Sequence, residues 1–139
     1  MKVMALDVGD IHTGVALSDS IALIATPLTT IHVADEDELV AAVLVLIEEH
    51  GAGEVVVGMP FTLSGEMGPQ AKRTVRFVHH LKSQTSVLIK TVDERLSTVE
   101  ATRRMREAGV RRKRVSENID AAAAAVVLQA YLDSGGGRD

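Results

Sequence analysis

The segment Glu54–Gly58 constrains the fold of this chain more than any other part of the sequence. Three valines follow one another at positions 55–57, without the alternation of a strand that has one face in solvent. Continuous apolar strands occur where both faces of a sheet are covered. Because helix patterns precede and follow this segment, we expect it to lie in a sheet with helices on both faces.

Four further strand patterns flank this segment. The predicted strands are, in chain order, Lys2–Asp7, His12–Ser18, Leu23–Val33, Glu54–Gly58 and Val87–Val92. Short connections join the first three, so we expect these to form an antiparallel meander. Pro27 interrupts the third strand, and proline lacks the amide hydrogen that an interior strand donates. The third strand is therefore expected at an edge of the sheet.

Helix signals fill most of the remaining chain. Helices are expected from Asp35 to Gly51, from Pro69 to Lys82, from Ser97 to Gly109, and over Ile119–Leu132. Asp35 and Ser97 each precede a glutamate by three residues, which is a capping signature. The sequence thus predicts an α/β fold: a mixed five-stranded sheet, its first three strands antiparallel, with helices on both faces. We expect a single domain over residues 1–133 and a disordered, glycine-rich tail over residues 134–139.

Composition excludes several classes of protein. At 139 residues the chain is long enough for one domain with a substantial core. It has no cysteine, which excludes disulfides, thiolate metal sites and cysteine nucleophiles. Its only aromatic residues besides histidine are Phe61, Phe77 and Tyr131, so aromatic stacking is not expected to dominate nucleic-acid binding. No apolar run reaches the roughly 18 residues of a membrane span, and we expect a cytoplasmic protein.

Three acidic residues stand where predicted elements begin or end. Asp7 closes the first strand, Glu94 follows the fifth, and Asp120 lies at the head of the last helix. Rigid elements would hold these carboxylates while leaving them accessible to solvent. Divalent cations such as Mg2+ or Mn2+ prefer oxygen ligands. Because one or two such ions activate water and stabilise the leaving oxygen at a phosphodiester, the leading hypothesis is a metal-dependent nuclease.

Each acid also has a purely structural explanation. Asp7 precedes a turn at Gly9, and an acid at the start of a helix, as Asp120 is, interacts favourably with the helix dipole. Asp93 and Glu94 are adjacent, so in an extended chain their side chains point in opposite directions. We expect Glu94, rather than Asp93, to face the site.

Basic residues are concentrated in one part of the chain. Seven of the fifteen Lys and Arg residues lie within positions 103–114. The net charge is −4, but a local basic patch matters more to a phosphate backbone than the total. A solvated helix end is the alternative explanation of this patch. The candidate substrate-binding residues are Arg111, Arg112, Lys113 and Arg114 in the patch, and Lys72 and Arg73 on the second predicted helix.

Four motifs resemble those of the YqgF family, also called RuvX, which is named for pre-16S rRNA nucleases and was once labelled Holliday-junction-resolvase-like. The first motif joins Asp7-Val8-Gly9 to the Gly-Val-Ala-Leu-Ser-Asp of residues 14–19. The others are Val57-Gly58-Met59-Pro60 with Gly65 and Gly68, Asp93-Glu94-Arg95-Leu96-Ser97-Thr98, and Asp120-Ala121 with Leu128 and Gln129. Their order and spacing cover nearly the whole chain.

This resemblance implies a ribonuclease H-like fold in which Asp7, Glu94 and Asp120 are the catalytic, metal-binding acids. It also implies a nuclease that processes ribosomal RNA precursors, with RNA favoured over DNA as the partner. Arg95, next to Glu94, is expected to steady a carboxylate or to contact a phosphate through its two-pronged guanidinium group.

One position departs from the family pattern. The family usually carries a basic pair where this chain has Ile11 and His12. His12 is expected to contact substrate in place of the missing charge, but only when its imidazole is protonated. Ile11 cannot replace that charge, which puts one phosphate contact near the first acid in question.

Three other functions are compatible with these features. A nuclease acting on DNA or a Holliday junction would use the same acids, and symmetric cutting would favour a homodimer over a monomer. A non-catalytic nucleic-acid-binding module of the same fold would need no metal site. An actin-like or sugar-kinase-like ATP binder also has an early Asp-x-Gly turn, but it needs a second such domain to enclose the nucleotide.

Overall fold

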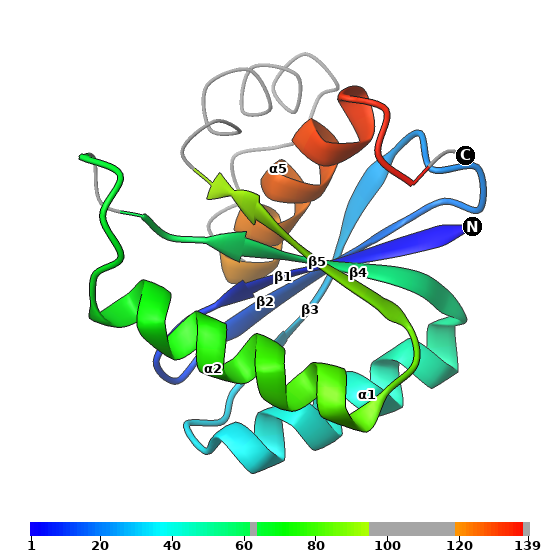
Figure 1. Ribbon diagram of the computed structural model, residues 1–139. Coiled ribbons are helices and arrows are strands. Elements are labelled where there is room, and N and C mark those ends of the chain that lie inside the picture. The colour runs from blue at the N-terminus through cyan, green and yellow to red at the C-terminus, as the bar shows by residue number, and fades with distance from the viewer. Residues whose placement is uncertain (62–63, 95–118, 138–139) are drawn as a thin grey trace.

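The computed structural model describes residues 1–61, 64–94 and 119–137, which build a five-stranded sheet with helices on both faces (Figure 1). The strands are β1 (Lys2–Val8), β2 (Thr13–Ser18), β3 (Ala25–Ile31), β4 (Ala52–Met59) and β5 (Leu88–Asp93). The helices are α1 (Glu36–His50), α2 (Pro69–Gln84) and α5 (Ile119–Asp133). The predicted fold class is confirmed, and the predicted strands and helices in these ranges differ from the observed ones only near their ends.

The strand order is β3-β2-β1-β4-β5. β2 runs antiparallel to both β1 and β3, whereas β4 runs parallel to both β1 and β5. Pro27 lies in the edge strand β3, as predicted, next to a shift in its register with β2. Because β1, β4 and β5 are parallel, their carboxyl ends lie at the same edge of the sheet.

The apolar run in β4 is buried on both faces, as its sequence predicts. Val55 and Val57 pack in one cluster with residues of α1 and α2, and Val56 packs in a second cluster with residues of α5. All three valines are fully buried. α1 and α2 therefore cover one face of the sheet and α5 covers the other (Figure 1).

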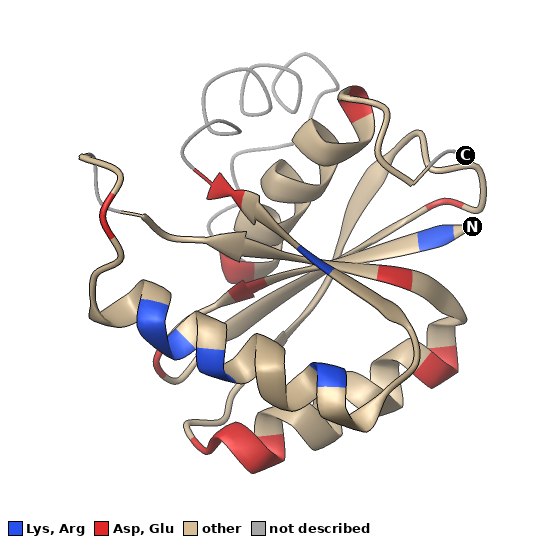
Figure 2. Ribbon diagram, in the orientation of Figure 1, with Lys and Arg blue, Asp and Glu red and all other residues tan. Residues whose placement is uncertain are grey.

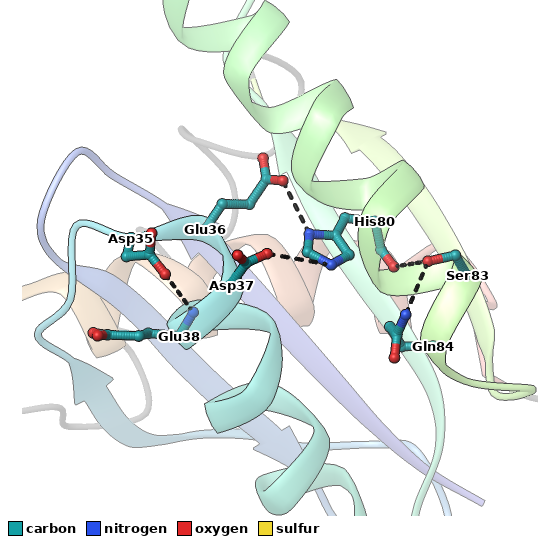
Figure 3. Close-up of polar contacts among 7 residues, drawn as sticks. All are labelled: Asp35, Glu36, Asp37, Glu38, His80, Ser83 and Gln84. Atoms are coloured by element: carbon teal, nitrogen blue, oxygen red, sulfur yellow. Dashed lines mark hydrogen bonds and ion pairs between the residues drawn. The ribbon is translucent and has the colours of Figure 1, made fainter.

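Helix α1 begins and ends where its capping residues predict. The side chain of Asp35 accepts a hydrogen bond of 3.0 Å from the backbone N–H of Glu38. Gly51 follows the last turn with φ of 65°, a left-handed conformation that glycine adopts without strain. On α2, His80 contacts Glu36 at 3.0 Å and Asp37 at 3.6 Å, so a polar bridge joins the two helices (Figure 3).

Helix α5 approaches the sheet closely because both surfaces carry small residues. Ala121, Ala124 and Ala125 are buried on the helix. Opposite its first turn lies Gly14 of β2, where an added Cβ atom would overlap the backbone carbonyl of Asp120. Gly14 therefore sets how near the start of α5 can come to the sheet, and this fixes the backbone position of Asp120.

The described chain ends in a turn after α5. The backbone N–H groups of Gly135 and Gly136 donate to the carbonyl oxygens of Leu132 and Tyr131, at 3.0 and 2.9 Å. Glycine allows this tight turn, in which Gly135 has φ of 96°. The disordered tail expected over residues 134–139 stays a prediction. Residues 138–139 lie outside the described residues. None of the helices within the described ranges has the length and apolar composition needed to cross a bilayer.

The contact at Gly14 predicts an unequal cost of two glycine substitutions. We expect Gly14→Ala to lower the free energy of unfolding by about 2 kcal/mol or more, because backbone must move to admit the methyl group. Gly51→Ala is the matched control: it has open space but a positive φ, and should cost about 1 kcal/mol. Urea denaturation measures both. An equal or smaller loss for Gly14→Ala would contradict close packing of α5 on β2.

Candidate active site

The shared carboxyl edge of the parallel strands brings Asp7 and Glu94 together. Asp7 is the second-last residue of β1, and Glu94 directly follows β5. Leu6 pairs with Val57, which places Asp7 beside Gly58 in the intervening strand β4. A Cβ atom on Gly58 would lie 3.6 Å from the carboxyl carbon of Glu94. The side chain of Glu94 thus lies against Gly58 of β4, on the strand next to Asp7, and a methyl group at Gly58 would make ordinary van der Waals contact with it.

The carboxyl groups of Asp7 and Glu94 interact directly, and both are only partly exposed. Burial, then the charge of Asp7 and the hydrogen bond with it, raise the pKa of Glu94 to about 7, with Asp93 adding to the effect. Burial also raises the pKa of Asp7, and the charge of Asp120 adds to this, while the hydrogen bond with Glu94 opposes it. The pair therefore retains a proton more readily than isolated carboxyl groups do.

Asp120 approaches this pair from the first turn of α5. Its charge acts on Asp7, and its Oδ2 atom lies 3.5 Å from Nδ1 of His12. His12 belongs to the turn between β1 and β2, so the sequence-predicted residue next to the first acid does lie at the site. The three acids come from three distant parts of the sequence and meet at one edge of the sheet.

The donor set of this cluster suits a hard divalent cation, because carboxylate oxygens are its preferred ligands. Burial and the negative charges of neighbouring carboxylates, Asp120 for Asp7 and Asp7 for Glu94, raise the pKa of both groups and favour a bound proton or cation. Within the described ranges, however, no three His, Asp or Glu side chains are grouped closely enough to hold a metal as they stand. Asp7 and Glu94 therefore fit a cation directly, and Asp120 would join them after a change in its side chain or in the start of α5.

Helix α2 is connected to the loop that follows Asp7. Gln70 donates through Nε2 to the carbonyl oxygen of Val8 at 2.5 Å. Arg73 pairs with Asp10 and also donates to Oε1 of Gln70 at 2.9 Å. Figure 2 shows basic positions along α2 and acidic positions at the ends of β1 and β5. Of the two predicted substrate-binding residues here, Lys72 is exposed, whereas Arg73 already has acidic and amide partners.

Several predicted site residues lie outside the described residues. They are Arg95, Arg111, Arg112, Lys113 and Arg114, together with the helix predicted from Ser97 to Gly109. Among the described residues, the structure adds Gly58, Gln70 and His32 to the surroundings of the acids. A glycine at the end of a continuous apolar strand often marks a place where another group packs against the strand, so Gly58 could be recognised from the sequence. Gln70 and His32 had none, because their contacts depend on the folded arrangement.

The raised pKa of Glu94 predicts how the stability of the metal-free protein depends on pH. Glu94 is shifted from 4.5 to about 7 in the folded state, so between these values the folded protein binds more protons than the unfolded chain. The free energy of unfolding should therefore fall as the pH rises through this window. We expect a loss on the order of 1 kcal/mol, because partial exposure screens the interaction.

Urea denaturation in EDTA between pH 4 and 8 measures this loss, with Glu94→Gln as the comparison. The glutamine cannot ionise, so most of the slope between pH 4.5 and 7 should disappear in the variant. Identical slopes in both proteins would show that Glu94 ionises normally in the folded state.

The RuvX family model, described as "Holliday junction resolvase", matches residues 1–134 of the chain. A protein of Chloroflexus aurantiacus named "Putative pre-16S rRNA nuclease" is 42% identical over 132 residues, covering 95% of this chain and 86% of that protein. A protein of the same name from Thermoanaerobacter pseudethanolicus is 44% identical over 135 residues, covering 96% and 97% of the two chains.

Solved structures share the fold at low sequence identity. RuvC of T. thermophilus, in complex with a Holliday junction substrate, matches with a TM-score of 0.63 and 19% identity, covering 97% of this chain and 96% of that one. The fowlpox virus Holliday junction resolvase matches with a TM-score of 0.59 and 10% identity, covering 96% and 99%. The structural matches establish the RuvC-like, ribonuclease H-like fold, and the family model and the relatives above 40% identity show that the chain belongs to the RuvX family.

Proposed function

We propose that this chain is a metal-dependent nuclease that cleaves a ribosomal RNA precursor, with Asp7, Glu94 and Asp120 holding one or two Mg2+ or Mn2+ ions. Membership of the RuvX family makes the chain a nuclease. The metal, the roles of the three acids and the RNA substrate are the proposed parts. A ribosomal substrate would place the protein in the cytoplasm, as a monomer or a homodimer.

The observation that carries this proposal is the pairing of Asp7 with Glu94 at the carboxyl edge of the sheet. Two interacting, half-buried carboxyl groups whose pKa values are both raised, chiefly by burial, are unfavourable as two anions unless a positive charge or a proton is present. Structural ion pairs lower such pKa values, so this pair has the electrostatics of a cation site rather than of a structural contact. Asp120, whose charge reaches Asp7, supplies a third carboxylate.

The chemistry follows from what each group contributes. A bound divalent ion lowers the pKa of a water molecule and stabilises charge on the leaving oxygen of a phosphodiester. Asp7 and Glu94 bind from rigid strand ends, so their oxygens keep a fixed separation. Asp120 completes the set from α5, and exposed Lys72 lies where a phosphate backbone passing α2 would meet a cation. Gln70 and Arg73 hold the loop after Asp7 in place.

The name shared by the relatives supports RNA as the substrate. The description of the family model favours a second candidate, a four-way DNA junction. Both substrates present phosphodiester bonds to the same acids, so the site alone does not separate them. Cleavage assays on a single-stranded RNA precursor segment and on a synthetic four-way junction, at equal concentrations, distinguish the two: we expect cleavage of the RNA.

Removing any one of the three acids should abolish metal-dependent cleavage. We expect Asp7→Asn, Glu94→Gln and Asp120→Asn each to lower the rate at least 100-fold with Mg2+ or Mn2+, because each variant loses an anionic ligand. Glu48→Gln is the matched control. Glu48 is an exposed acid near the end of α1, next to the start of β4, whereas the site lies at the carboxyl ends of the parallel strands. Single-turnover cleavage rates measure the effect. A near-normal rate in any of the three, with metal bound normally, would remove that residue from the site.

The basic segment at residues 111–114 should contribute most of the electrostatic binding of nucleic acid. Replacing Arg111, Arg112, Lys113 and Arg114 by glutamine should weaken binding across different sequences, because phosphate contacts do not depend on the base. The slope of log affinity against log salt should also flatten, by roughly 0.7 to 0.9 for each lost contact. Fluorescence anisotropy at several salt concentrations measures both. An unchanged affinity and slope would leave α2, with Lys72, as the binding surface.

A further inference from the structure

We infer that His12, braced by the ring of His32, is a positioning residue that orients the carboxylate of Asp120 in the active site. The inference rests on the proposed function, because it assigns His12 a role only through an acid that binds metal. It also differs from the expectation that His12 contacts substrate phosphate. The inference is carried by contacts that fix the backbone of His12, its ring and the backbone of Asp120.

The backbone of His12 is fixed by the turn between β1 and β2. A Cβ atom at Gly9 would overlap the carbonyl oxygen of His12, so the turn closes tightly only with glycine at that position. Thr13, the next residue, begins β2 and pairs with Ile31 of β3. His12 therefore directly precedes a rigid strand, and its backbone position is fixed although its side chain is 47% exposed.

The ring of His12 has a neighbour on each of two sides. Its Nδ1 atom lies 3.5 Å from Oδ2 of Asp120. The ring of His32 packs edge-on against it, with the centroids 4.7 Å apart and the planes at 82°. His32 directly follows β3, so the two histidines extend the pairing of Thr13 with Ile31 by one residue on each strand. His32 therefore limits the rotation of His12 away from Asp120.

Asp120 is consequently held at two points, by β2 itself and by the turn that precedes it. Its backbone carbonyl packs against Gly14, and its side chain contacts His12 two residues earlier in the chain. An acid in the first turn of a helix otherwise has several side-chain rotamers to choose from. Contact at Oδ2 leaves Oδ1 for a cation, which matters because the three acids are not yet grouped at metal-binding separation.

This role does not require a change in the charge of His12. Nδ1 carries a proton in the imidazolium ion and in one neutral tautomer, so its N–H group can face Oδ2 of Asp120, 3.5 Å away, in either form. Residues that orient metal ligands from behind typically affect metal affinity 10- to 100-fold.

The experiment measures Mn2+ affinity by isothermal titration calorimetry at pH 8 for the wild-type protein, His12→Ala, His12→Asn, His32→Ala and Asp120→Asn. His79→Ala is the matched control, since His79 is an exposed histidine on α2. We expect His12→Ala to weaken Mn2+ binding roughly 10-fold, His32→Ala to weaken it a few-fold, and His79→Ala to bind as wild type. His12→Asn should recover part of the loss, because its amide N–H can take the place of the imidazole N–H beside Asp120.

The sign of the change separates positioning from simple electrostatics. Removing a positive charge beside three acids would strengthen Mn2+ binding, whereas losing the contact that orients Asp120 weakens it. Unchanged or tighter binding by His12→Ala would overturn the inference. Nitrogen coupling to bound Mn2+ in pulsed electron paramagnetic resonance, lost in His12→Ala, would also overturn it, because His12 would then be a direct ligand.

The result for Asp120→Asn distinguishes a failure of the proposed metal site from a failure of the role of His12. If the wild-type protein binds Mn2+ and Asp120→Asn loses affinity while His12→Ala does not, the proposed metal site stands and only the role of His12 fails. If the wild-type protein binds no Mn2+, the proposed function fails and the inference fails with it. Weaker binding by both variants, with partial recovery in His12→Asn, supports both.

Discussion

The proposed active site depends on the unfavourable burial of two carboxyl groups that the sheet brings together. Asp7 lies in β1 and Glu94 follows β5, on either side of β4, and the side chain of Glu94 lies against Gly58 of β4. Their half-buried surroundings raise the pKa of both, to about 7 for Glu94. Proteins keep a partly buried carboxyl pair of this kind where it serves a function. A bound cation offsets the negative charge of both carboxylates more completely than a shared proton does.

The third acid depends on a different constraint, the close packing of α5 on β2. Gly14 and the alanines of α5 allow backbone to approach backbone, which brings the start of the helix to the edge where Asp7 lies. The fold thus provides two rigid acids from strand ends and one from a helix end. A small shift of α5 would change the position of Asp120 without disturbing the pair of Asp7 and Glu94.

Features encoded by local pattern were predictable from the sequence. The valine run of β4, the edge position of Pro27 and the helix caps at Asp35 and Gly51 follow from periodicity and backbone chemistry, and the structure confirms them. Contacts between distant segments were not predictable. His80 with Glu36, Arg73 with Asp10, and His12 with His32 each join residues that only the folded chain brings together.

Proton release on metal binding tests the central claim most directly. If a divalent cation replaces the proton held by Asp7 and Glu94, calorimetry of Mn2+ binding at pH 6 in buffers of different ionisation enthalpy should show release of about one proton. The release should fade by pH 8, above the pKa of about 7 for Glu94, and should be absent at pH 6 in Glu94→Gln. Mn2+ binding at pH 6 without proton release would contradict the account, because the cation would then bind away from this pair.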